Sequence, residues 1–95
     1  NTHIIILYDY YKKLFNEKEQ QYFEDYYFNN LTLEEVSENM NVSRNNVHKT
    51  LKAMEHNLLE YEDKLELYKK SIQIDEIICD IKDKAIIDKI KEIIG

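Results

Sequence analysis

The feature that most constrains this 95-residue chain is that it contains no proline and only one glycine. Tight hairpins depend on residues that accept positive φ or pre-set a turn, and a proline inside a helix would break it. A chain without these residues favours long, uninterrupted helices. We therefore predict an all-α fold, at a length near the lower limit for a single hydrophobic core.

Two helices are predicted before residue 30. Residues 4–15 place five apolar side chains on one helical face, namely Leu7, Tyr8, Tyr11, Leu14 and Phe15. Asn16 is a favourable N-cap, and Glu19 completes a capping box three residues later, so the second helix is expected over about residues 17–28. Tyr10 and Phe28 lie off the two apolar faces, so we expect them to be exposed.

A helix-turn-helix is predicted between Leu31 and Leu51. Thr32 opens a Thr-x-x-Glu capping box for a short helix, Asn41 tolerates the left-handed turn that follows, and Ser43 caps the next helix. Ser37 is the small residue at the helix crossing, and the apolar wedge consists of Val36, Met40, Val42, Val47 and Leu51. This spacing is typical of motifs whose second helix enters a nucleic-acid groove.

The exposed start of the second helix carries the candidate nucleic-acid-binding residues, which are Ser43, Arg44, Asn45, Asn46, His48, Lys49 and Lys52. Arg and Lys suit guanine edges or phosphates, Asn suits adenine, and the capped helix N-terminus can hold a phosphate. The net charge of −6 opposes a general attraction to phosphate, but residues 43–54 contain three basic and no acidic side chains. We therefore predict modest, salt-sensitive binding through one positive face.

An apolar stripe extends the second helix well past this motif. Steps of four and three residues connect Val47, Leu51, Met54, Leu58, Tyr61, Leu65 and Tyr68. A helix from Arg44 to Lys70 would be about 40 Å long, so residues 1–70 are predicted to form a helix-turn-helix head with an extended last helix. The isoleucine-rich residues 71–95 are expected to form helices that pack on this extension or on a partner chain. A homodimer seam along the stripe is the alternative.

Catalysis, metal binding and membrane insertion are not expected. The carboxylates are scattered, there is no glycine-rich phosphate loop, and His48 and His56 are eight residues apart, so we predict no enzyme activity, cofactor or zinc site. Cys79 is the only cysteine, which suits a reducing cytoplasm. The longest apolar run, residues 4–8, is far shorter than the roughly 20 residues of a membrane span. We expect a cytoplasmic, soluble protein that makes no membrane contact.

Several segments carry a family resemblance. Residues 31–51 resemble the promoter-reading fourth region of bacterial sigma factors. Over most of its length the chain is similar to the YlxM-type family, whose genes lie beside signal-recognition-particle genes. The matching segments are Leu7–Tyr11, Tyr22–Tyr27, Leu31–Val36, Asn41–Arg44 and Leu59–Tyr68, and the resemblance fades from Ser71. Family members more often read Gln-Ala-Val-Tyr-Asp where this chain has Asn45–Lys49. The resemblance implies a regulatory or accessory role in the signal-recognition-particle pathway.

Two functions remain open at this point. In the first, the candidate residues bind duplex DNA or signal-recognition-particle RNA. In the second, the chain docks on a protein component of the particle and the helix-turn-helix is only a scaffold. Phosphate neutralisation predicts a steep salt dependence, and apolar docking predicts a shallow one. A continuous positive strip along Arg44, Lys49 and Lys52 would favour the first function, and carboxylates crowding that strip would favour the second.

Overall fold

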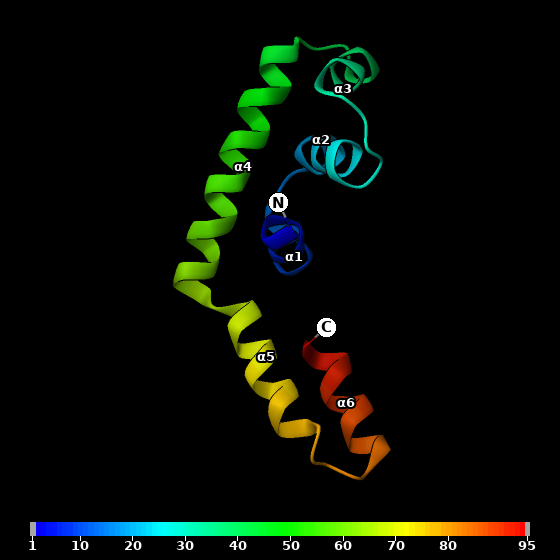
Figure 1. Cartoon of the computed structure of the whole chain (residues 1–95), viewed down its shortest axis with the longest axis vertical. Coiled ribbons are helices and arrows are strands. Elements are labelled where there is room, and N and C mark those ends of the chain that lie inside the picture. Colours follow the sequence, from blue (N-terminus) through cyan, green and yellow to red (C-terminus); the bar gives the residue numbers. More distant parts are fainter. Residues whose placement is uncertain (1, 95) are drawn as a thin grey trace.

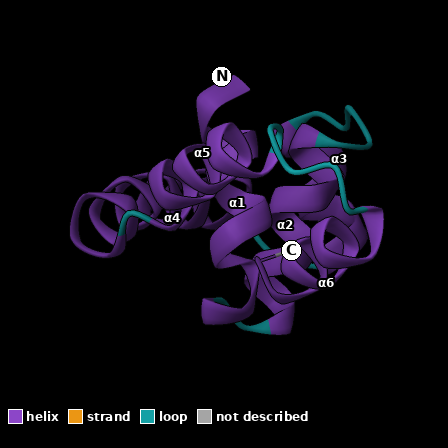
Figure 2. Ribbon diagram, turned by 90° about the horizontal axis from the view of Figure 1, so that it is seen from below, coloured by secondary structure: helices purple, strands orange, loops and turns teal. Residues whose placement is uncertain are grey.

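The computed structural model describes residues 2–94. Asn1, the first residue of the predicted head (1–70), and Gly95, the last residue of the predicted C-terminal region (71–95), lie outside the described residues. Within this range the elements are α1 (Thr2–Tyr11), the 3₁₀ turn η1 (Lys12–Leu14), α2 (Glu17–Tyr27), α3 (Leu33–Met40), α4 (Arg44–Leu65), α5 (Leu67–Ile78) and α6 (Lys84–Ile94). No strand occurs among residues 2–94, so the predicted all-α fold is confirmed (Figure 2).

The molecule is elongated and measures 52 × 24 × 21 Å, and the long helix α4 runs along it (Figure 1). Helices α1, α2 and α3 lie along one side of it, and α5 and α6 extend beyond its C-terminal end (Figure 1). None of the helices within the described residues is both long and apolar enough to cross a membrane.

The predicted helix starts are confirmed. Asn16 and Thr32 each form a reciprocal capping box with the glutamate three residues later. Ser43 Oγ accepts a hydrogen bond from the backbone N–H of Asn46 at 3.0 Å. Asn41 has φ 54° and ψ 48°, the left-handed conformation expected of the turn. Each of these features is set by residues no more than three positions apart, which is why the sequence alone reveals them.

The core lies between α4 and the three helices beside it. Tyr8 and Phe23 stack at its centre, with ring centroids 4.0 Å apart. The wholly buried side chains are Leu7, Tyr8, Tyr11, Tyr22, Phe23, Val36, Val47, Met54 and Leu58. Leu14 was predicted to face this core, but it is 56% exposed because the chain tightens into η1, which changes the rotation per residue. Phe28 is exposed, as predicted.

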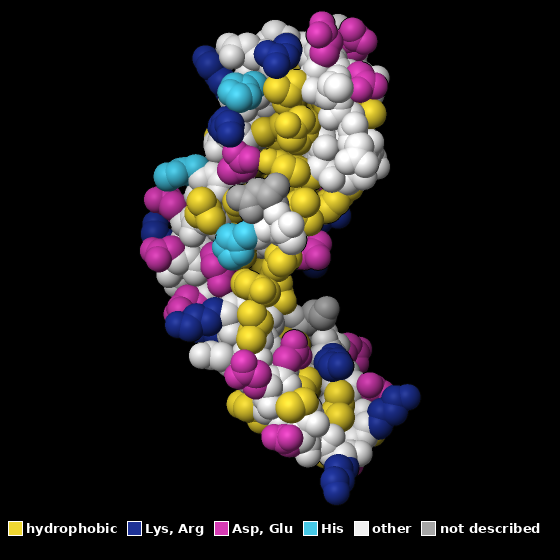
Figure 3. Space-filling view, viewed as in Figure 1, with side chains coloured by type: hydrophobic (Ala, Val, Ile, Leu, Met, Phe, Trp, Pro, Cys, Tyr) yellow, Lys and Arg dark blue, Asp and Glu magenta, His cyan; other side chains and the backbone are white. Residues whose placement is uncertain are grey.

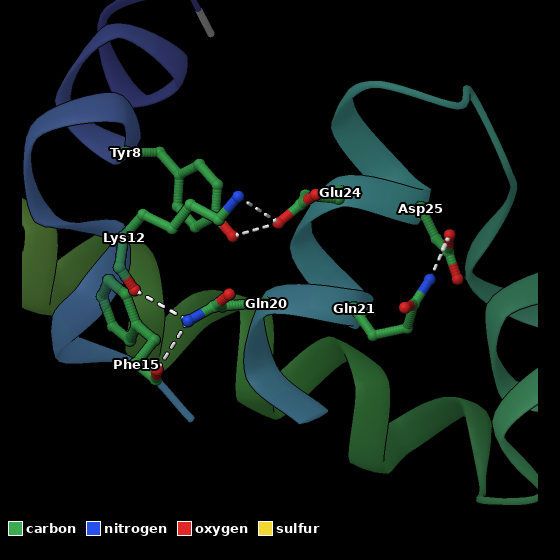
Figure 4. A network of polar contacts seen from close by, with 7 residues as sticks. All are labelled: Tyr8, Lys12, Phe15, Gln20, Gln21, Glu24 and Asp25. Carbon is green, nitrogen blue, oxygen red and sulfur yellow. Dashed lines mark hydrogen bonds and ion pairs between the residues drawn. The ribbon is translucent and has the colours of Figure 1, made fainter. Parts of the chain in front are cut away.

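Polar contacts join α1 and η1 to α2 (Figure 4). The Tyr8 hydroxyl donates to Glu24 Oε2 at 2.7 Å, and Lys12 Nζ lies 3.5 Å from the same oxygen. Gln20 Nε2 donates to the carbonyl oxygens of Lys12 and Phe15, at 3.1 and 2.8 Å. Burial and the bond to Glu24 raise the pKa of Tyr8, so the phenol stays protonated and continues to donate. These contacts supply partners for polar groups that would otherwise lose water.

The long helix is shorter than predicted. It ends at Leu65 rather than Lys70, because Glu66 adopts φ 54° and ψ 35° and the chain turns there into α5. The 22 residues of α4 span about 33 Å. The apolar stripe is therefore not one continuous seam. Its first four members are buried in the core, Leu65 is exposed, and Tyr68 belongs to α5.

Glu62 holds the joint between α4 and α5. Its Oε1 accepts hydrogen bonds from the Tyr11 hydroxyl at 2.6 Å and from the backbone N–H of Tyr68 at 3.1 Å. Its Oε2 accepts from the backbone N–H of Lys69 at 3.1 Å. The Tyr11 oxygen in turn accepts from the backbone N–H of Leu67 at 3.1 Å. A side chain of α4 thus provides partners for the free N–H groups that begin α5.

Helix α5 packs partly on α1. The hydroxyls of Tyr10 and Ser71 are hydrogen-bonded at 2.7 Å, so Tyr10 is half-buried and the predicted exposure of this residue is wrong. The isoleucine faces of α5 and α6 are only partly covered. Ile78 is buried, whereas Ile77 is 68% and Ile93 is 84% exposed.

Candidate nucleic-acid interface

Helices α3 and α4 form the predicted helix-turn-helix. The turn is closed by the backbone N–H of Val42, which donates to the carbonyl oxygen of Ser37 at 3.0 Å. Val36 and Val47 are fully buried between the helices, and the small Ser37 is nearly so. Met40 and Val42 are half-buried and pack against the same core. The predicted wedge is therefore confirmed, and it fixes the direction in which α4 leaves the motif.

Two tyrosines of α2 fix the rotation of α4 about its own axis. The Tyr22 hydroxyl donates to Asn46 Oδ1 at 2.9 Å. The Tyr27 hydroxyl donates to Glu55 Oε1, and burial together with this bond raises the pKa of Tyr27. These contacts connect residues at least 24 positions apart. They determine which side of α4 faces solvent.

All seven predicted binding residues are exposed. At about 100° per residue, Asn45, Lys49 and Lys52 lie on the side of α4 opposite Val47 and the core. The structure thus brings the predicted residues together over the first three turns of one helix.

The seven residues differ in how free they are to bind a ligand. The side chains of Arg44, Asn45, His48 and Lys49 make no hydrogen bond or ion pair with other residues in the 2–94 range. Asn46 has its carbonyl oxygen engaged by Tyr22. Lys52 shares its charge with Glu55, at 3.4 Å. The engagement of Asn46 could not be read from the sequence, because it depends on how α2 packs on α4. Lys52 and Glu55, in contrast, are an i,i+3 pair on one helix, which the sequence already contains.

Positive charge gathers at the start of α4. Its first turn contains no acidic residue, and the N-terminal end of a helix carries a partial positive charge of its own. Figure 3 shows Lys, Arg and His side chains over this part of α4 and carboxylates over the neighbouring α3. Of the three cations in the predicted strip, Arg44 and Lys49 are exposed and unpaired within residues 2–94, whereas Lys52 is paired with Glu55.

A pocket next to the start of α4 was not predicted from the sequence. Its volume is about 720 Å³, and it is lined by Tyr26, Tyr27, Asn30, Leu31, Thr32, Leu33, Glu34 and Arg44. We refer to it as the α2–α3 pocket. Asn30 has φ 56°, a left-handed conformation that lets the chain leave α2 sharply. The Asn29-Asn30 pair marks the end of a helix in the sequence, but it does not reveal a pocket.

Comparison with known proteins gives matches along the whole chain. The profile of a family described as "Putative helix-turn-helix protein, YlxM / p13 like" matches residues 1–94. A UPF0122 protein of Malacoplasma penetrans is 36% identical over 91 residues, which cover 96% of this chain and 85% of the relative. A UPF0122 protein of Desulforamulus reducens is 41% identical over 78 residues, or 82% and 67% of the two chains. One of Fusobacterium nucleatum is 34% identical over 84 residues, or 88% and 82%. The family match continues past Ser71, where the resemblance was expected to fade, and includes α5 and α6.

Proposed function

Because the chain belongs to the UPF0122 family of YlxM/p13-like helix-turn-helix proteins, we propose that it binds nucleic acid through the start of α4. The observation that carries this proposal is the set of unpaired, exposed side chains on the second helix of the motif, namely Arg44, Asn45, His48 and Lys49. Ser43, Asn46 and Lys52 lie at the edges of the set and contribute less.

Each residue has a role that its chemistry supports. Arg44 and Lys49 contact phosphates or guanine edges, and the amide of Asn45 pairs with adenine. Asn46 has only its NH₂ group left to donate, because its carbonyl oxygen accepts from Tyr22. If two or three cations each neutralise one phosphate, the logarithm of the binding constant for duplex DNA should fall with the logarithm of the salt concentration, with a slope of about −2 to −3.

The biological role that fits this interface is a regulatory or accessory one, exerted by binding and without catalysis. The family resemblance makes signal-recognition-particle RNA one probe of choice. The composition, rich in asparagine and isoleucine, indicates an AT-rich genome and makes AT-rich duplex DNA the other. Fluorescence anisotropy at two salt concentrations should detect binding to one of them. The double variant Arg44→Ala/Lys49→Ala should lose most of that binding.

A matched control is available on α6. Lys84→Ala/Lys89→Ala removes the same charge from exposed positions far along the molecule, and it should bind as the wild type does. Equal losses in the two double variants would mean that only net charge matters, and the assignment to α4 would be abandoned.

A protein partner is the second candidate function, favoured by the uncovered apolar surface of α5 and α6. A groove of about 1190 Å³ runs between these helices and α1, and Ile74, Ile78, Ile87, Ile93 and Ile94 are among its lining residues. In this case the chain docks on a protein component of the signal recognition particle. Binding would then resist salt, would tolerate Arg44→Ala/Lys49→Ala, and would be lost in Ile93→Asp.

A further inference from the structure

The α2–α3 pocket has the chemistry of a nucleobase site. We infer that it accepts one unpaired guanine, extruded from a folded nucleic acid whose paired stem contacts α4. This inference rests on the proposed function and narrows its target from nucleic acid in general to a strand with an exposed guanine base. A stacking surface, two charged walls and the exclusion of phosphate support it.

Tyr26 provides the stacking surface. It is half-buried, and none of the described rings stacks on it. Its one aromatic neighbour, Tyr27, meets it at 90° with centroids 5.0 Å apart. Tyr27 is itself held by packing on Phe23, at 4.4 Å, and by its bond to Glu55. A fixed tyrosine therefore supports a second one that lines the pocket and has no ring stacked on it. Proteins commonly bind unpaired nucleotides by stacking a base on such a ring.

Glu34 and Arg44 form charged walls that suit the two edges of guanine. Both side chains are exposed and line the pocket, and they form no ion pair with each other, so each charge is available to a ligand. Arginine donates to the O6 and N7 acceptors of guanine. The carboxylate accepts from the N1–H and the exocyclic amino group on the adjacent, Watson–Crick edge. That edge is occupied by cytosine in a base pair, so Glu34 can reach it only when the guanine is unpaired. Adenine has no N1–H and fits less well.

A backbone phosphate would be disfavoured in the same pocket. Glu34 and Glu35 occupy the first turn of α3, where their charges oppose an anion at the helix N-terminus. The pocket is an open depression of about 720 Å³ on the surface. A base with its ribose can lie in it while the phosphates stay outside, nearer the cations of α4.

The test compares hairpins that differ by a single nucleotide. Anisotropy would be measured with a fully paired RNA hairpin and with hairpins carrying one unpaired guanine, adenine or uracil, together with the DNA versions of each. The wild type should bind the unpaired-guanine hairpin more tightly than the paired one. The RNA and DNA versions show whether the ribose contributes.

Three variants isolate the pocket. Tyr26→Leu keeps apolar packing but removes stacking, and it should weaken binding of the unpaired-guanine hairpin by at least about fivefold. Tyr26→Phe should keep the preference. Because Glu34 is exposed, Glu34→Gln should leave the fold unchanged. It should abolish the tighter binding of the unpaired-guanine hairpin relative to the unpaired-adenine hairpin. Glu76→Gln, an exposed glutamate on α5, is its matched control.

The outcomes distinguish the pocket from the proposed function. Equal binding of paired and unpaired hairpins, still sensitive to Arg44→Ala/Lys49→Ala, would overturn the guanine site and leave the α4 interface intact. The same applies if folded Tyr26→Leu and Glu34→Gln retain the wild-type preference. No binding of any hairpin or duplex would remove the proposed function and the guanine site together.

Discussion

Replacing Glu62 with glutamine tests how the angle between α4 and α5 is maintained. The carboxylate accepts three hydrogen bonds, from the Tyr11 hydroxyl and from the backbone N–H groups of Tyr68 and Lys69. Glutamine has nearly the same shape, but it has one acceptor oxygen and an NH₂ group that would face a donor. One or two charge-assisted bonds are therefore lost.

The magnitude follows from the number of bonds and their exposure. A hydrogen bond to a charged group contributes about 1.5–3 kcal/mol when it is buried, and solvent reduces this for a half-exposed side chain such as Glu62. We expect Glu62→Gln to lower the free energy of unfolding at pH 7 by about 1–2 kcal/mol. For a domain of this size the Tm should fall by about 4–8 °C per kcal/mol.

The dependence on pH provides a second readout. Burial of Glu62 raises its pKa, but the hydrogen bonds from Tyr11, Tyr68 and Lys69 together lower it below its ordinary value of 4.5. Because the folded-state pKa is the lower one, the stability from this carboxylate is complete above the unfolded-state value. It is lost as the pH falls through the folded-state pKa. The difference between wild type and variant should therefore shrink on acidification.

Urea denaturation between pH 7 and pH 3, followed by circular dichroism, measures both effects. Amide exchange should also speed up at Tyr68 and Lys69. Glu60→Gln is the control, because Glu60 is exposed on the same helix and meets only His56, at 3.7 Å. A variant within about 0.3 kcal/mol of wild type at pH 7, or a difference that does not change with pH, would refute this account of the joint.

Three further predictions concern stability. Burial and the bond to Glu62 raise the pKa of Tyr11 to about 12, so its contribution should be complete below pH 10 and disappear as the pH rises through 12. Urea titrations at alkaline pH should show this loss in wild type and a smaller one in Tyr11→Phe. Glu66→Gly should raise the free energy of unfolding by about 0.5–1 kcal/mol, and with it the Tm, because glycine accepts φ 54° without steric cost. A lower Tm would show that the glutamate side chain outweighs the backbone strain. Met54→Ala removes a fully buried side chain and should cost about 2–5 kcal/mol in chemical denaturation, whereas the exposed Leu59→Ala should cost less than about 1 kcal/mol.

The sequence alone was sufficient for the helix-turn-helix. The caps at Asn16, Thr32 and Ser43 and the left-handed Asn41 are as predicted, because each depends on hydrogen bonds or backbone preferences within a few residues. The buried stripe from Val47 to Leu58 is equally local, since helical periodicity places those side chains on one face.

The tertiary structure decided where α4 ends and which candidate residues are free. The turn at Glu66 depends on contacts with Tyr11, which is more than 50 residues earlier in the chain. The engagement of Asn46 depends on Tyr22, and the α2–α3 pocket forms only when α2, the following loop and Arg44 come together. Local patterns specify where helices begin and which faces are apolar. Partners across the core determine how far a helix runs and which of its polar side chains remain available to bind.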